Sequence, residues 1–344
     1  MNIKREQMIA QRDWRNHINA SCKTPQYNKP SGNFTGAQTA QRTRKTSSVV
    51  YQASRPSRPL IGIALGAGAA RGWAHIGVLK ALKKAGISPD VVAGTSIGAV
   101  AGGCYIANKL KALEAFATDL SLRRIFSYLD FNIRGGGLIS GDRLHEALGD
   151  HLDHQPIETF SKRFVSIATE LKSGKEVWLE KGPITQAVRA SYALPGIFNP
   201  VCLEGQWLTD GALVNPIPVS ACRALGAQYI IAVNLNSSET VDHRSEAKVR
   251  QRDQLKNTPG IKSVIYDAFN ISMNSITNAR MAADQPDLKI QPKLGTIGMF
   301  DFHRAKESIA LGELAVKTAL CEIKRNRDIF QPASSSSKMH AMTT

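Results

Sequence analysis

The chain has 344 residues, 42% of them apolar, which is ordinary for a soluble globular protein of one large or two modest domains. Its formal net charge of +16 favours an anionic partner, and residues 1–58 alone carry eleven basic and two acidic side chains. No helix-turn-helix, zinc-finger or RNA-binding signature follows this basic leader, so nucleic acid is not expected as a partner. The leader is either a solvated basic segment or a means of reaching an anionic membrane surface.

The five cysteines stand far apart and form no CxxC pair, so they indicate neither a disulfide framework nor a zinc site, and a reducing compartment fits best. The N-terminus begins basic but has no apolar stretch typical of a secretory signal. The longest uncharged run, residues 91–110 interrupted only by Lys109, is explained better by a buried strand, turn and helix than by a membrane span. We therefore expect a cytoplasmic protein, with peripheral association at the membrane surface as the alternative.

The segment after the leader alternates strands and helices. Leu60 begins a short apolar strand, LIGIAL, which runs straight into glycines as buried parallel strands do. Residues 73–85 then place apolar side chains at helical spacing and end at Gly86, a helix stop. A second strand over 89–93 and a second helix over 97–107 follow. This β-α-β-α order predicts a parallel sheet covered by helices on both faces.

Residues 1–58 and 327–344 are polar and are predicted to be a disordered basic leader and a disordered tail. Between them, apolar patterns predict further elements: a helix begun by Ser140, a hairpin of strands 164–171 and 176–179, a helix over 184–193, strands over 207–209 and 229–235, a structureless loop over 236–260, helices over 261–283 and 304–324, and a short strand over 288–290. We expect one α/β domain over residues 59–326, a three-layer α/β/α fold with a mainly parallel central sheet.

The strongest local signal is Gly94-Thr-Ser-Ile-Gly98. It lies where a predicted strand ends and a helix begins, the context that a nucleophile elbow requires. So tight a turn needs residues without bulk two positions before and two after the serine, and glycine meets that need. Ser96 would also gain from the positive end of the helix dipole, which favours developing negative charge. The pattern predicts Ser96 as a nucleophile.

A second glycine-rich turn, Gly66-Ala-Gly-Ala-Ala-Arg-Gly72, joins the first strand to the first helix, where several backbone N–H groups can converge on one anion. A dinucleotide-binding loop is one interpretation, because Gly66 and Gly68 fit GxGxxG and Asp90 lies at the ribose-binding distance, but Arg71 stands at the sixth position. The other is an oxyanion loop that serves the neighbouring elbow. Arg71 either anchors the loop or meets an anionic head group.

The third signal is Asp210, which ends a predicted strand and is followed by Gly211; alone, this pair predicts only a turn. Together the three signals resemble the patatin-like phospholipase family, in which a glycine-rich oxyanion loop, a GxSxG elbow and an Asp-Gly turn occur in this order. The segments Thr169–Lys175 and 184–200 also look like that family's hairpin and the region before its aspartate. The resemblance covers residues 59–235 closely and the last two helices loosely, and is strongest to the compact bacterial members.

The resemblance implies a serine lipid acyl hydrolase with Ser96 as nucleophile and Asp210 as its base, without a histidine between them. It implies a phospholipid or another lipid ester as substrate, an acyl-enzyme intermediate, and no metal or cofactor. A carboxylate that serves as base needs a pKa useful near neutrality, so we expect Asp210 to be partly desolvated. The loop would supply backbone N–H donors from Gly66, Ala67 and Gly68, and many relatives carry another glycine where this chain has Ala67.

Other interpretations stay open. His243 and His303 both follow Asp210, so the Ser-Asp-His order of an α/β-hydrolase esterase is available. His75 is interpreted as a packed or loop-anchoring residue. A hypothesis of a different class is a binding or regulatory module that keeps the fold and leaves the serine idle. The sequence gives no oligomeric state.

Overall fold

The computed structural model describes residues 58–121, 137–139, 155–236 and 261–325. Within these ranges eight strands form one mixed sheet in the order β10-β9-β1-β2-β4-β8-β7, with β5 paired to β4. The strands are β1 (Ile61–Leu65), β2 (Val91–Thr95), β4 (Arg163–Glu170), β5 (Glu176–Leu179), β7 (Val201–Leu203), β8 (Gln206–Asp210), β9 (Tyr229–Val233) and β10 (Leu288–Ile290). A separate parallel pair joins β3 (Gly137–Ile139) to β6 (Gly196–Phe198).

The sheet is mainly parallel, as predicted. Strands β10, β9, β1, β2 and β4 pair in parallel, whereas β5, β7 and β8 join through antiparallel pairings. Every residue of β1, β2 and β9 is buried. Burial on both faces explains why these strands are nearly unbroken apolar runs rather than alternating ones.

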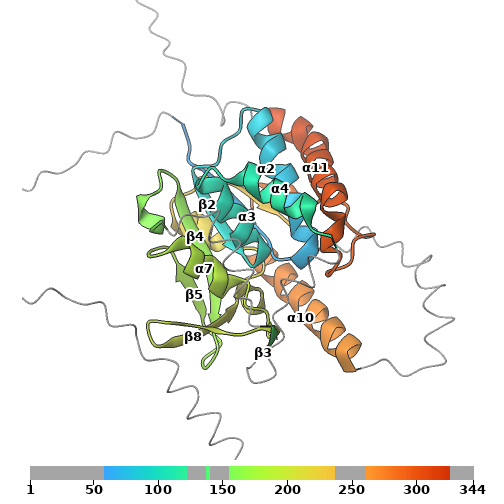
Figure 1. The fold of residues 1–344 in the computed structure, drawn as a ribbon. Helices are drawn as coiled ribbons and strands as arrows, with labels where there is room; N and C mark the ends of the chain where they lie inside the picture. The colour runs from blue at the N-terminus through green and yellow to red at the C-terminus, as the bar shows by residue number, and fades with distance from the viewer. Residues whose placement is uncertain (1–57, 122–136, 140–154, 237–260, 326–344) are drawn as a thin grey trace, which may run out of the picture. The chain divides into compact units, whose positions relative to one another are not determined.

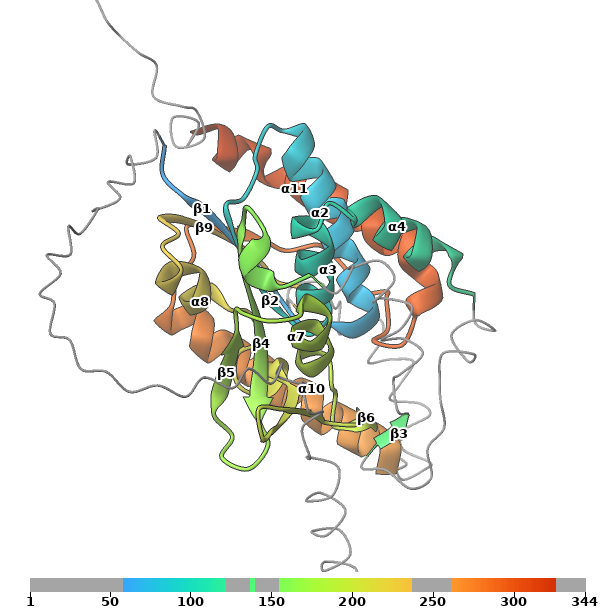
Figure 2. The same cartoon turned by 60° about the vertical axis from the view of Figure 1, so that its left-hand side comes forward.

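Helices cover both faces of the sheet (Figure 1, Figure 2). Ile61, Ile63 and Leu65 of β1 belong to a large apolar cluster on one face, whereas Ala64 belongs to a cluster on the other, as the two-residue period of a strand dictates. The first cluster includes α2 (Ala74–Lys84), α3 (Ile97–Ile106), α4 (Leu110–Asp119), α7 (Ile184–Ser191) and α11 (Ala305–Arg325). The second includes α8 (Val219–Ala224) and the end of α10 (Ile261–Ala283). The predicted three-layer α/β/α fold is confirmed.

One edge of β4 brings the ends of β2 and β8 together. The first five residues of β4 pair with β2, as far as Ile167 opposite Thr95. Its last three pair with β8, beginning with Ala168 opposite Asp210. Ser166 and Ala168 also pair with β5, which therefore occupies the other edge of β4. Consequently β8 pairs with the same edge of β4 beyond the point where β2 ends, and Asp210 lies next to the end of β2.

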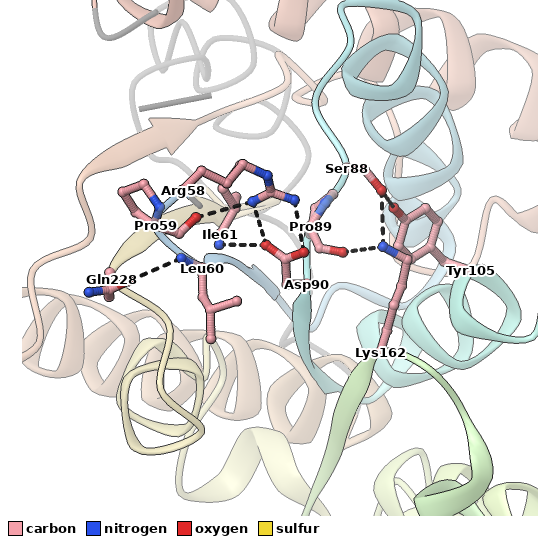
Figure 3. A network of polar contacts seen from close by, with 10 residues as sticks. All are labelled: Arg58, Pro59, Leu60, Ile61, Ser88, Pro89, Asp90, Tyr105, Lys162 and Gln228. Carbon is pink, nitrogen blue, oxygen red and sulfur yellow. Dashed lines mark hydrogen bonds and ion pairs between the residues drawn. The ribbon is translucent and has the colours of Figure 1, made fainter. Parts of the chain in front are cut away.

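A polar network at the opposite ends of these strands holds β1 beside β2 (Figure 3). Arg58 donates two hydrogen bonds to Asp90, at 2.7 and 2.9 Å, and the Ile61 N–H donates to the same carboxylate at 2.9 Å. Lys162, just before β4, donates to the Pro89 carbonyl at 2.5 Å. Ligands of open α/β sheets bind at the carboxyl ends of the strands, whereas Asp90 precedes β2. The dinucleotide interpretation, in which Asp90 binds a ribose, is therefore wrong.

Short elements account for most differences from the sequence-based prediction. The expected helix over 73–85 is preceded by a 3-10 helix, η1 (Ala69–Trp73), and α4, α8, β6 and β7 were not predicted. Most of these are too short for periodicity to identify. The predicted helix after Ser140, the leader as far as residue 57, the tail, and residues 237–260 of the predicted loop lie outside the described residues. No helix in the described part of the chain is long and apolar enough to cross a membrane.

The cysteines differ in state. Cys104 and Cys222 are free and buried, and burial raises the pKa of each thiol to about 12. Cys202, in β7, is disulfide-bonded. The spacing of cysteines in the sequence gave no sign of this bond, because spacing does not tell which thiols meet in the fold.

Candidate active site

Ser96 occupies a strained turn between β2 and α3. Its φ of 57° and ψ of −124° place a non-glycine residue in a conformation that costs free energy. A Cβ on Gly94 would lie 2.5 Å from Ala99 Cα, and one on Gly98 would lie 2.1 Å from the Leu65 carbonyl oxygen. Neither position can hold a side chain without moving the backbone. The two glycines thus permit the turn that exposes the Ser96 hydroxyl at the end of the sheet.

Asp210, the last residue of β8, accepts a hydrogen bond from that hydroxyl. Ser96 Oγ donates a hydrogen bond of 2.7 Å to Asp210 Oδ2, and the Ala212 N–H donates one of 2.8 Å to Oδ1. Asp210 is only 1% exposed. Burial raises the pKa of its carboxyl from 3.8 to about 7, although the hydrogen bonds from Ser96 and Ala212 act in the opposite direction. A Cβ on Gly211 would lie 2.3 Å from the Ile167 carbonyl oxygen, so glycine is required after the aspartate.

The loop of residues 66–72, here called the oxyanion loop, leaves β1 beside the elbow. Two of its three expected donors are already engaged, because Gly66 N–H donates to Val233 O at 3.2 Å and Ala67 N–H donates to Pro216 O at 2.9 Å. Within the described residues, the N–H groups of Gly68 and Ala69 have no hydrogen-bond acceptor. The available donor pair is therefore Gly68 and Ala69 rather than the expected set that included Gly66 and Ala67.

Contacts outside the loop hold its shape. His75 is fully buried, and its Nε2 donates a 2.7 Å hydrogen bond to the Gly66 carbonyl. Burial lowers the His75 pKa to about 4, so the ring is neutral at neutral pH. Arg71 Nε donates to the Ile297 carbonyl at 2.8 Å and Nη1 to Asn236 Oδ1 at 3.3 Å. Both side chains anchor the loop, as expected for His75, and the contacts of Arg71 agree with the first of the two interpretations offered for it.

Gly72 closes the loop against the elbow. A Cβ on Gly72 would lie 2.2 Å from the side chain of Ile97, the residue after Ser96. The loop and the elbow are therefore in direct van der Waals contact, with no room for a methyl group between them. This packing fixes the distance between the two parts of the site.

Ser191, at the end of α7, is a site residue that the sequence analysis did not single out. Its Oγ accepts a 2.8 Å hydrogen bond from the Ser96 N–H and donates one of 2.5 Å to the Ile167 carbonyl. The backbone N–H of Ser96 is thus engaged and is not a further oxyanion donor. Ser191 lies in the segment 184–200, which contributed to the family resemblance, but that resemblance assigned no role to this serine.

Among the described residues, no histidine lies between Ser96 and Asp210, whose Oγ and Oδ2 atoms are in direct hydrogen-bond contact. Both carboxylate oxygens of Asp210 already accept hydrogen bonds, and among the described residues neither comes from a histidine. His303 is exposed in the 3-10 helix η5 (Phe302–Arg304), and His243 lies outside the described residues. The arrangement presents a serine hydroxyl, a carboxylate with a pKa near neutrality and two unpartnered N–H groups at the end of one sheet, a set suited to acyl transfer.

Known proteins resemble this chain across the site. The family model described as patatin-like phospholipase matches residues 63–223, which include the oxyanion loop, the elbow and Asp210. An uncharacterized NTE family protein of Mycobacterium tuberculosis is 28% identical and covers 77% of this chain and 92% of its own length. Lysophospholipase nte1 of Emericella nidulans is 27% identical over 89% of this chain and 22% of its own length. VipD from Legionella pneumophila, a solved structure, is 13% identical, with a TM-score of 0.45 over 78% of this chain and 67% of that chain.

Proposed function

This chain belongs to the patatin-like phospholipase family, and on that premise we propose that it is a serine lipid acyl hydrolase acting through a Ser96–Asp210 dyad. The observation that carries the proposal is the direct 2.7 Å hydrogen bond between the Ser96 hydroxyl and the buried Asp210 carboxylate. A serine hydroxyl is a weak nucleophile until a neighbouring base can take its proton. The family and the lysophospholipase relatives favour a phospholipid, a lysophospholipid or another lipid ester as substrate.

In the first half of the proposed reaction, Ser96 Oγ attacks the ester carbonyl carbon and its proton passes to Asp210 Oδ2. The N–H groups of Gly68 and Ala69 stabilise the negative charge that develops on the carbonyl oxygen. The tetrahedral adduct then loses the alcohol or lysolipid, whose oxygen receives the proton from Asp210. In the second half, water gives a proton to Asp210 and attacks the acyl group. Asp210 then returns this proton to Ser96 Oγ as the fatty acid leaves, which restores the Ser96 hydroxyl and the Asp210 carboxylate.

The pKa of Asp210 suits this role. A general base works best when its pKa lies near the operating pH, because it is then both ionised and basic enough to accept a proton. An ordinary aspartate is too weak a base for a serine hydroxyl, whereas burial raises the Asp210 pKa to about 7. The neutral His75 ring is committed to the Gly66 carbonyl and takes no part in proton transfer. These contacts support the dyad over the triad with His243 or His303.

We also propose that the protein reaches its substrate by peripheral contact with an anionic membrane. The formal net charge of +16 supports such contact, since anionic lipid surfaces attract basic segments. Binding to vesicles of mixed neutral and anionic phospholipid, measured at rising salt, tests this part. Binding that is strong only at low salt supports it, and binding that is equal on purely neutral vesicles contradicts it.

Hydrolysis of a short-chain p-nitrophenyl ester and of mixed phospholipid vesicles tests the catalytic proposal. We expect Ser96→Ala and Asp210→Asn to lose activity by about a thousandfold or more, because the nucleophile and its base act as a unit. His243→Ala and His303→Ala should keep full activity, as should the control Ser275→Ala on the exposed side of α10. Full activity in Asp210→Asn would refute the dyad and favour a triad. A folded wild type that is inactive on both substrates would favour the binding module.

A further inference from the structure

A contact on the far side of the oxyanion loop determines where one of its two free amides points. In a trans peptide group the carbonyl and the following N–H point in opposite directions, so a bond that holds one also orients the other. The N–H of Gly68 shares its peptide group with the Ala67 carbonyl. That carbonyl accepts a 2.9 Å hydrogen bond from Asn236 Nδ2, three residues after β9. Asn236 is 169 residues away in the sequence, so this orientation depends on the folded sheet.

The Asn236 amide is itself held in one orientation. Its Oδ1 accepts from Arg71 Nη1 at 3.3 Å, while Nδ2 donates to the Ala67 carbonyl and lies 4.0 Å from Met273 Sδ. A guanidinium only donates and a carbonyl only accepts, so exchanging the amide oxygen and nitrogen would oppose both partners. The backbone N–H of Asn236 donates to Asn234 Oδ1 at 2.9 Å, which fixes the main chain at this point.

The other amides of the loop do not rely on Asn236. Gly66 N–H and Ala67 N–H are engaged by carbonyls of other loops and strands. The N–H of Ala69 shares its peptide group with the Gly68 carbonyl, which accepts a 3.1 Å hydrogen bond from the Arg71 N–H inside the loop. Of the two free amides, only that of Gly68 is therefore set by a side chain from a distant part of the sequence.

We propose that Asn236 is a positioning residue that aims the Gly68 N–H at the reacting carbonyl oxygen. The inference rests on the proposed function, because an oxyanion forms only if Ser96 attacks an ester. Asn236 need not touch the substrate for this role. Its effect belongs to the transition state, where the charge on that oxygen is largest, and not to binding of the uncharged ester.

Asn236→Asp is the variant that isolates this role. It keeps the size of the side chain and the partner of Arg71, but it places a carboxylate oxygen against the Ala67 carbonyl and removes the donor. We expect kcat on a p-nitrophenyl ester to fall about 10- to 100-fold, somewhat less than the loss of a whole oxyanion donor, with KM nearly unchanged. Asn278→Asp, on the exposed side of α10, makes the same charge change and should alter neither parameter.

A second readout separates positioning from general damage to the fold. A trifluoromethyl ketone adds to a serine hydroxyl and forms a hemiketal oxyanion, so its inhibition constant should rise in Asn236→Asp by the factor by which kcat/KM falls. Complete fluorophosphonate labelling gives the fraction of active sites. Damage to the fold would reduce that fraction and leave the inhibition constant of the remaining sites unchanged, and this result would overturn the proposal, as would an unchanged kcat.

A third readout does not need activity. In spectra of protein labelled with ¹⁵N-glycine, the Gly68 amide, identified by its loss in Gly68→Ala, should shift in Asn236→Asp and stay in place in Asn278→Asp. If wild type neither hydrolyses esters nor reacts with a fluorophosphonate, the proposed function fails, and an amide shift would still show that Asn236 orients Gly68. An unmoved Gly68 amide would refute the positioning role whatever the activity of wild type.

Discussion

Replacing Asp210 with asparagine is expected to stabilise the fold while it removes activity. The side chain is buried beside Ser96, and burial raises its pKa because the charged form loses water. Asparagine has the same shape and can keep both hydrogen bonds, since its oxygen can accept from the Ala212 N–H and its amide can donate to Ser96 Oγ. The variant thus removes the buried charge and still offers a hydrogen-bond partner to both the Ala212 N–H and Ser96 Oγ.

The magnitude follows from the two pKa values. The Asp210 pKa is about 7 in the fold and 3.8 ordinarily, and each pH unit between them is worth about 1.4 kcal/mol. Because the folded-state pKa is raised, the stability that Asp210 contributes is fully present below its ordinary pKa and is lost as pH rises to the folded value. The advantage of asparagine should therefore grow from about 1 kcal/mol near pH 4.5 to about 4 kcal/mol near pH 8.5.

Urea unfolding of wild type and Asp210→Asn across this pH range measures the difference directly. We expect the gap in the free energy of unfolding to widen by about 3 kcal/mol between about pH 4.5 and about pH 8.5, and then to level off. A gap that is the same at both ends of the range would show that the Asp210 pKa is ordinary. The account of Asp210 as a base tuned by burial would then be wrong.

Three further outcomes follow from the same contacts. For wild type, log kcat/KM should rise with pH at a slope near one up to about pH 7 and then level, since Asp210 must be ionised in the free enzyme; a flat profile across that pH contradicts this. Ser191→Ala removes the acceptor of the Ser96 N–H, so it should lower the free energy of unfolding in urea by about 1–3 kcal/mol and also lower kcat. No change in either quantity would show that the elbow does not need this contact. Gly98→Ala should lower the free energy of unfolding by about 3 kcal/mol or more, because its Cβ would lie 2.1 Å from a carbonyl oxygen. In the same helix, the Cβ of Gly103→Ala would meet only side-chain atoms at 3.2 Å and beyond, so this control should be nearly neutral. Equal costs of the two variants would refute the steric argument.

The fold was predictable where apolar patterns are long and uniform. The strands β1, β2 and β9 are buried on both faces, so their sequences read as unbroken apolar runs, and the helix α2 between β1 and β2 shows clear periodicity. The three-layer arrangement followed from the alternation of strands and helices. The meeting of β8 with the end of β2 was not predictable in this way, because it depends on β4 being longer than the strand it pairs with.

The site was predictable only in part. The elbow and the glycine loop are local in sequence, so their glycines could be interpreted directly. The partnership of Ser96 with Asp210 joins residues 114 positions apart and came from the family resemblance. The free donors Gly68 and Ala69 could not be identified from the sequence, because which amides are engaged depends on carbonyls of distant strands and loops. The supporting side chains Ser191 and Asn236 escaped notice for the same reason.

Covalent labelling with a fluorophosphonate, followed by peptide mapping, tests the central claim most directly. The account predicts one adduct, on Ser96, that forms rapidly in wild type and in His303→Ala and at least about a hundredfold more slowly in Asp210→Asn at neutral pH. The slower rate would show that the buried carboxylate, and no histidine, activates the serine. Labelling of Asp210→Asn at the wild-type rate, or an adduct on another residue, would contradict the account.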